Sequence, residues 1–344
     1  MDRYKNLILV AVPACAIYAI CLNLYKSFRR NKCVVFESRR TLPCYLYLYV
    51  RCKIQSFRKR KGQLYPHGAK TVNPTFTILN CRLNVDDVRW YCWAAGYGWD
   101  YPDSVFRDIP LCFCDVLCCR LLAMVISSHD FRLSPQGLFP VCQTIRKFEP
   151  IDELKRFSFS LEAGVGDYRP VDSGVEVDVW FKALRADRPV WESVVTMLSP
   201  RDYPASNVKL QSNCVDAAVE KKSLDIKVPL LTGLKSAWAF SDISLKNVLV
   251  LPSRLAIVGR STTHCLWMMS QCLAEIEKHN GADAVRAPLS VSVQFKQQLE
   301  LQKKVIIHFW QATDEGCQQP VCRFQLQDSR GTAYILGEII REPD

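Results

Sequence analysis

The stretch that decides the fold is STTHCLWMMSQCLAEIEK, residues 261–278. Leu266, Met269, Leu273 and Ile276 recur in it near helical spacing, which predicts a helix with one apolar face. Segments that alternate polar and apolar residues, or are rich in β-branched ones, follow this helix and predict strands. These strands are expected at residues 289–295, 305–311, 321–327 and 334–340. One long helix followed by several antiparallel strands is an α+β pattern.

The first half of the chain shows the same order of elements. Residues 82–95 predict a short helix with Asn84 as its N-cap, and the apolar run at 110–126 has the length of a longer helix. Strands are predicted at residues 156–162, 175–184 and 190–198. Because the pattern occurs twice, we expect two sheets, each wrapped around its own central helix.

Between these two halves lies a polar stretch that contains Pro200, Pro204 and Pro229. Its composition predicts a linker. The expected domains are 1–25, a membrane anchor; 26–70, a basic arm; 71–200, the first α+β domain; 201–236, the linker; and 237–344, the second α+β domain.

The composition is that of a globular protein, with 344 residues of which 49% are hydrophobic and 23% charged. It excludes a disordered, collagenous or low-complexity chain. The net charge of +11 is concentrated near the N-terminus, since residues 26–62 hold twelve Lys and Arg against one acid, Glu37. A basic segment of this kind binds nucleic acid or an anionic membrane. We favour the membrane, and expect no nucleic-acid partner, because an apolar run precedes the segment.

That run is LILVAVPACAIYAICLNL, residues 7–24, and it contains no charge. Its length is at the short end of what crosses a bilayer, and Pro13 is tolerated in a membrane helix. The basic residues that follow it predict a single-pass anchor with the bulk of the chain in the cytosol. The endoplasmic reticulum is the expected membrane, with the mitochondrial outer and peroxisomal membranes as alternatives. A cleaved signal peptide and a buried helix are the competing interpretations of the run.

Seventeen cysteines stand mostly in apolar surroundings, which predicts reduced thiols that pack as small hydrophobic groups. The spacing of Cys112, Cys114, Cys118 and Cys119 forms no CxxC pair, so no zinc site is expected there. The sequence also contains no phosphate-binding glycine loop, HExxH, GxSxG or EF-hand pattern. We therefore expect neither a metal nor a cofactor.

The order of residues over 263–300 resembles a known family. His264 opens the helix, and Leu266-Trp267 and Cys272-Leu273-Ala274 come after it. The strand LSVSVQFK at 289–296 then leads into QLEL at 298–301. This pattern is similar to the MaoC-like hotdog family, which contains the (R)-specific enoyl-thioester hydratases and the 3-hydroxyacyl-thioester dehydratases. In the first half, GLFPV at 137–141, followed by Ile145-Arg146, resembles the N-terminal hotdog of the double-hotdog members. The resemblance spans roughly residue 71 to the C-terminus and implies two hotdog domains.

The family's catalytic signature is Asp-x-Asn-Pro-x-His, about seventeen residues before the histidine that opens the helix. Counting back from His264 places Asp242 on the catalytic aspartate and Asn247 on the catalytic histidine. Ser244 and Leu245 stand in place of the Asn-Pro pair. The resemblance therefore implies Asp242, Asn247 and His264 as catalytic residues.

Substrate contacts are implied for Ser244, Cys265 and Trp267, with Cys265 standing where the family usually has glycine. The implied substrate is an acyl thioester of coenzyme A or of acyl carrier protein. Because an asparagine side chain cannot take up a proton at neutral pH, two functions stay open: an active dehydratase or hydratase, and an inactive acyl-thioester-binding or scaffold protein. A thioesterase is a third, weaker alternative, and a homodimer is left open as the assembly.

Overall fold

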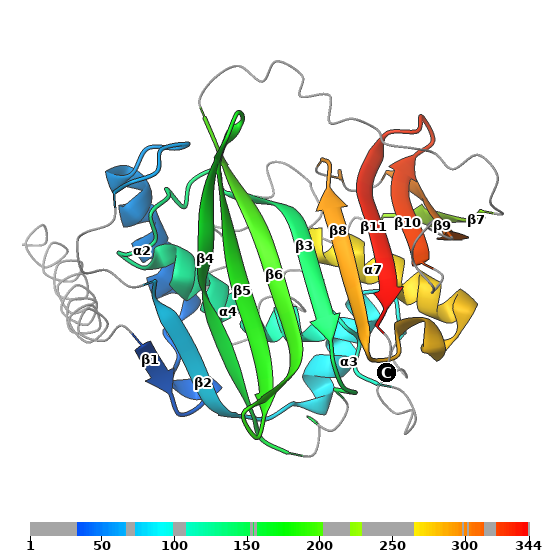
Figure 1. The fold of residues 1–344 in the computed structure, drawn as a ribbon, viewed down its shortest axis with the longest axis horizontal. Helices are drawn as coiled ribbons and strands as arrows, with labels where there is room; N and C mark the ends of the chain where they lie inside the picture. The colour runs from blue at the N-terminus through cyan, green and yellow to red at the C-terminus, as the bar shows by residue number, and fades with distance from the viewer. Residues whose placement is uncertain are drawn as a thin grey trace, which may run out of the picture.

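The computed structural model describes residues 33–66, 73–98, 108–151, 154, 157–201, 221–228, 265–297, 299–300, 303–312 and 321–342. In this part of the chain, eleven strands form one sheet in the order β1-β2-β4-β5-β6-β3-β8-β11-β10-β9-β7 (Figure 1). The strands of the first half are β1 (Cys33–Phe36), β2 (Thr75–Cys81), β3 (Phe139–Lys147), β4 (Phe159–Val171), β5 (Gly174–Arg185) and β6 (Arg188–Pro200). Those of the second half are β7 (Lys222–Lys227), β8 (Leu289–Phe295), β9 (Lys304–Ala312), β10 (Val321–Asp328) and β11 (Ala333–Arg341).

The first half is built around helix α4 (Phe113–Ser127), which lies against β2, β4 and β5. Helix α2 (Tyr45–Arg58) packs on α4 as well. Most side chains of α4 are therefore buried, including Val116, Leu121 and Val125. A helix that is apolar all round is stable only when it is covered on several sides, and here the sheet and α2 supply that cover.

The second half repeats this arrangement around helix α7 (Cys265–Asn280), which lies behind its strands in Figure 1. Strand β8 turns Leu289, Val291 and Val293 inward at alternate positions. A strand with one buried face shows this period of two. The short 3-10 helix η5 (Ala282–Val285) follows α7 and leads into β8.

The two halves share one sheet, because β3 and β8 pair as antiparallel neighbours, with Ile145 opposite Val291 and Thr144 opposite Ser292. The expectation of two separate sheets is therefore wrong in this respect. Joining the strands satisfies backbone groups that each sheet would otherwise leave open at its edge.

The other predicted elements occur close to their expected positions. Helix α3 (Val85–Ala94) begins after Asn84, whose side chain accepts a hydrogen bond from the amide of Asp86, 3.1 Å away, as predicted for an N-cap. The described cysteines are free thiols.

Two of the predicted boundaries differ from the structure. Residues 33–58 of the expected arm form β1, the short 3-10 helix η1 (Arg39–Thr41) and α2, all of which belong to the first half. Strand β7 lies inside the expected linker and pairs with β9. Within the described residues no helix is both long and apolar enough to cross a bilayer. Residues 7–24 lie outside that range, so the anchor stays a prediction.

Candidate active site

The amino-terminal end of α7 is the part of the predicted site that the structure describes. The helix begins at Cys265, directly after His264, and its first turn contains no acidic side chain. The first four amides of a helix have no partner within it, and they give this end a partial positive charge. No carboxylate of the first turn neutralises that charge. The end of α7 is therefore suited to an oxygen atom on which negative charge develops.

The thiol of Cys265 sits at this end, and burial raises its pKa to about 12. The thiol is therefore neutral at physiological pH. Since the thiolate is the nucleophilic form of cysteine, Cys265 is not equipped to attack an ester or a thioester.

Helix α3 of the first half holds α7 in place through two hydrogen bonds. The indole N–H of Trp267 donates to the carbonyl oxygen of Ala94 over 2.8 Å. The phenol of Tyr91 donates to Ser270 Oγ over 2.9 Å, and that hydroxyl in turn donates to the carbonyl oxygen of Leu266 over 2.7 Å. All three side chains are buried. The first turns of α7 are thus fixed by residues from the other half of the protein.

Tyr91 also connects this end of α7 to the start of α4. Its ring meets the ring of Phe113 edge-on, with centroids 5.3 Å apart, and Phe113 is the first residue of α4. The preceding Cys112 lies beside Tyr91 and Ser270, and burial raises the pKa of its thiol. The amino-terminal ends of the two central helices therefore approach each other around one buried tyrosine.

A buried polar cluster that the sequence analysis missed lies in the first turn of α4. Gln143 Nε2 donates to Asp115 Oδ1 over 3.0 Å and to Ser193 Oγ over 3.1 Å. Burial raises the pKa of Asp115 to about 8, and the hydrogen bonds from Ser193 and Gln143 offset this only in part. Among the described residues, no group forms a hydrogen bond with Asp115 Oδ2. The carboxyl group is therefore largely protonated at neutral pH. The one signal in the sequence was an acid inside an apolar run.

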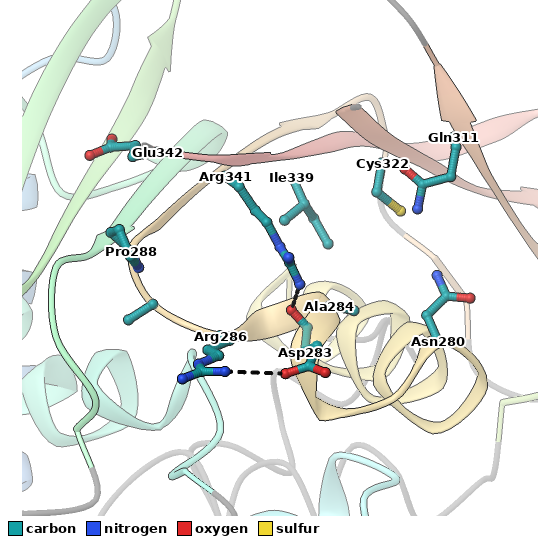
Figure 2. A pocket seen from close by; sticks show the side chains of 11 residues that line it. Asn280, Asp283, Ala284, Arg286, Pro288, Gln311, Cys322, Ile339, Arg341 and Glu342 are labelled. Atoms are coloured by element: carbon teal, nitrogen blue, oxygen red, sulfur yellow. Dashed lines mark hydrogen bonds and ion pairs between the residues drawn. The ribbon is translucent and has the colours of Figure 1, made fainter. Parts of the chain in front are cut away.

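The opposite, carboxyl-terminal end of α7 carries a hollow of about 670 Å³ (Figure 2). Arg341 extends across it and donates to the carbonyl oxygen of Asp283, while Arg286 lies 3.8 Å from the carboxylate of the same residue. Asp283 thus engages both guanidinium groups, and the hollow contains none of the predicted site residues.

The structure places two of the six predicted site residues, Cys265 and Trp267, both at the start of α7. Cys265 is half-buried, and the Trp267 ring is buried with its polar atom turned to α3. The other four predicted residues lie outside the described residues: Asp242, Ser244, Asn247 and His264. In the described ranges, no three His, Cys, Asp or Glu side chains gather as ligands for a metal ion.

Several solved structures share this fold. HtdX from Mycobacterium tuberculosis gives a TM-score of 0.55 at 15% identity, over 77% of this chain and 98% of that one. A MaoC-like dehydratase from Phytophthora capsici gives a TM-score of 0.59 at 16% identity, and the match covers 79% of this chain and 96% of that one. The full-length peroxisomal multifunctional enzyme type 2 from Drosophila melanogaster gives a TM-score of 0.55 at 13% identity, and the match covers 78% of this chain and 48% of that one. No family model and no curated protein sequence matches the chain.

One sheet, antiparallel except where β1 pairs with β2, covers a central helix in each half, and this arrangement is a double-hotdog fold. More particularly, the chain has the fold of the MaoC-like dehydratases, and the resemblance inferred from residues 263–300 is confirmed at the level of the fold. The structural similarity establishes the fold, and at these sequence identities the chemistry has to be argued from the residues.

Proposed function

We propose that this protein is a 3-hydroxyacyl-thioester dehydratase or enoyl-thioester hydratase that acts on fatty acyl-CoA or acyl-carrier thioesters. One observation carries the proposal. The chain shares the fold of MaoC-like dehydratases along more than three quarters of its length, and Asp242 and His264 precede its second central helix at the spacing of that family's signature. The substrate and the reaction go beyond the fold and rest on these two residues.

The start of α7 supplies the electrostatic part of the proposed reaction. Removal of a proton from Cα of a 3-hydroxyacyl thioester moves negative charge onto the thioester oxygen. Backbone amides at a helix terminus stabilise such an oxygen without having to reorient during the reaction. The first turn of α7 contains no acidic side chain to neutralise its partial positive charge, and Tyr91 and Trp267 hold the helix in place, so this end of α7 fits the role.

Proton transfer is assigned to Asp242, with His264 in support. Asp242 takes the α-proton as hydroxide leaves from the neighbouring carbon, and in the hydration direction it returns that proton. Asn247 holds the water or hydroxyl oxygen through its amide. It cannot protonate the leaving oxygen, so in this scheme that proton comes from Asp242 or His264.

The neutral thiol of Cys265 supports a mechanism without a covalent intermediate. A thioesterase that used this cysteine would need its thiolate, and burial disfavours that form. This argues against a thioesterase that has Cys265 as its nucleophile, and the hydro-lyase is preferred to other thioesterases because solved structures with this fold include MaoC-like dehydratases.

The second candidate is a protein that binds acyl thioesters without converting them. Asn247, standing where the family has its catalytic histidine, favours this candidate. Loss of a positioned acid or base lowers a rate by about 10²- to 10⁴-fold, whereas the amides of α7 persist whatever side chains surround them.

Hydration of a trans-2-enoyl-CoA, followed through the loss of enoyl thioester absorbance, tests the proposal. We expect Asp242→Asn to lower the rate by about 10²-fold or more while it keeps affinity for a saturated acyl-CoA, because the exchange removes the base and preserves the shape. A wild-type protein that binds acyl-CoA and converts nothing would favour the second candidate. Failure to bind any acyl thioester would refute both.

A further inference from the structure

Helix α2 exposes an apolar stripe on the side that faces away from α4. Val50, Ile54 and Phe57 follow each other at steps of four and three residues, so they lie along one face of the helix. Their exposed fractions are 42%, 46% and 89%. Leu48 and Gln55 on the other side of the helix are buried. The helix thus has a second apolar face, the α2 stripe (Val50, Ile54 and Phe57), which no described element covers.

Positive charge surrounds the α2 stripe. Residues 38–66 contain eight Lys and Arg and no Asp or Glu. Lys53 lies on the stripe, where its ammonium sits 5.4 Å from the centroid of the Tyr49 ring, and Arg58 and Arg60 are exposed at the end of the helix. Lys59 is turned inward and donates to the backbone oxygens of His129 and Phe131. The outward cations therefore lie beside the α2 stripe and at its carboxyl-terminal end.

An apolar strip between cations suits the surface of an anionic bilayer. Helices that lie in a membrane interface bury their apolar side chains below the headgroups and place Lys and Arg among the lipid phosphates and carboxylates. A second copy of the chain fits less well, because a twofold interface brings each patch against its own copy and would set Lys53 and Arg58 against like charges. A nucleic acid would pair with the cations through its phosphates and leave the apolar strip in water.

The position of α2 in the chain and in the fold agrees with this partner. Eight residues, 25–32, separate the uncharged run at 7–24 from β1, and they extend to at most about 28 Å. A bilayer that holds the uncharged run is therefore within reach of the first half. Helix α2 lies at the left end of the molecule in Figure 1, away from α7 on the right. Contact through α2 therefore does not involve the start of α7.

We propose that the α2 stripe, together with Lys53, Arg58 and Arg60, is a docking surface for an anionic lipid bilayer. This contact is additional to the predicted anchor at residues 7–24 and does not depend on the reaction that the protein catalyses. It holds the first half against the membrane and fixes how the body of the protein is oriented on it.

The test uses the full chain in vesicles that contain a trace of lipid with a photoreactive group on its acyl chain near the headgroup. Vesicles of phosphatidylcholine alone are compared with vesicles that also contain phosphatidylserine. After irradiation and digestion, lipid adducts on residues 45–61 are counted separately from those on residues 7–24. We expect adducts on 45–61 in the anionic vesicles, decreasing about fivefold or more with phosphatidylcholine alone or at high salt.

Two variants and one control complete the experiment. Val50→Ser/Ile54→Ser/Phe57→Ser should lower the adducts on 45–61 about fivefold or more, and Lys53→Gln/Arg58→Gln/Arg60→Gln should remove the preference for anionic vesicles. Phe157→Ser is the matched control, because Phe157 is 61% exposed and lies outside α2, and it should change nothing. A thermal melt checks that each variant is folded.

Three results would overturn the proposal: no adducts on 45–61 in anionic vesicles, adducts that the stripe variant leaves unchanged, or a dimer in solution that the stripe variant converts to a monomer. The last of these would assign the α2 stripe to a second copy of the chain.

Discussion

Lys147 and Asp108 form an ion pair of 2.8 Å at the seam between the two hotdog halves. The Lys147 side chain is only 1% exposed, and its ammonium also donates to the carbonyl oxygen of Val285 over 2.6 Å. Val285 belongs to η5 of the second half, while Lys147 ends β3 of the first. One buried cation therefore connects both halves at the end of the β3–β8 pairing, where Lys147 lies opposite Leu289.

Replacement of Lys147 by Met tests this connection. The variant leaves Asp108 with the amides of Ile109 and Ile151 as donors, but without a counter-charge. We expect the free energy of unfolding in urea to fall by about 2–3 kcal/mol, below the usual cost of breaking a fully buried pair because Asp108 is partly exposed. Lys182→Met is the control: its pair with Glu192 is more exposed, so the cost should be about 1 kcal/mol or less. Equal losses would show that Lys147 has no special role at the seam.

Asp115 predicts how stability depends on pH. Its folded pKa is about 8, against an ordinary value of 3.8, so the folded protein holds a proton that the unfolded chain releases above pH 4. The stability due to this group is complete at low pH and is lost as pH rises from about 4 to 8. Urea unfolding at pH 5 and pH 8 should show this loss in the wild type. Asp115→Asn should reduce it, because the amide stays neutral and keeps an acceptor for Gln143.

Asp178→Asn is the matched control for that experiment. Burial alone would raise the pKa of Asp178, but hydrogen bonds from Arg169 and Thr196 outweigh it and hold this pKa below its ordinary value. Its contribution is lost only as pH falls below about 4, so the difference between pH 5 and pH 8 should match that of the wild type. The same pH slope in Asp115→Asn and the wild type would contradict the assignment of a neutral carboxyl group.

Much of the fold could be predicted from periodicity, since burial of one face leaves a regular pattern in the sequence. The strand expected at 175–184 is β5 at Gly174–Arg185, and the Asn84 cap fixed the start of α3. Helix α2 was missed because Tyr and Leu alternate over residues 45–49 without a helical period, and the basic residues that follow favoured a membrane-bound arm. Pairing of β3 with β8 depends on edges far apart in the sequence, and no local pattern reports it.

The candidate site was less predictable, because its parts come from both halves of the chain. The motif located Cys265 and Trp267 at the start of α7. Nothing in the sequence indicated that Ala94 and Tyr91 would hold that helix, or that Gln143 and Asp115 would pair inside the first half. These hydrogen bonds are set by tertiary packing, of α3 against α7 in the first case and of β3 against α4 in the second.

The hydrogen bond between Trp267 and Ala94 predicts that two matched variants lose similar stability but differ in how well they bind acyl-CoA. Trp267→Phe keeps an aromatic ring and removes the indole donor, as does Trp191→Phe, whose indole donates to the carbonyl of Leu111 over 3.1 Å. Each variant should lower the free energy of unfolding by about 1 kcal/mol. On the proposed function, only Trp267→Phe should also weaken acyl-CoA binding severalfold in calorimetry, because it loosens the start of α7. Equal binding by both variants would remove Trp267 from the substrate site.

The last prediction concerns Asn247, the position at which this sequence departs from the family signature. Asn247→His introduces a group that titrates near neutral pH, so on the proposed mechanism it can protonate the leaving oxygen or deprotonate the attacking water. We expect the rate of enoyl-CoA hydration to rise by about tenfold or more, within the range that a positioned acid or base supplies, and to acquire a dependence on pH near 6–7.

Asn247→Gln is the matched control, since it alters the size of the side chain and adds no titrating group; it should not raise the rate. The double variant Asn247→His/Asp242→Asn should lose the gain, because the new histidine acts together with the aspartate. A rate unchanged by Asn247→His, in a protein that still binds acyl-CoA, would mean that residue 247 does not face the reacting carbon, and the transfer of the signature onto residues 242–247 would then be wrong.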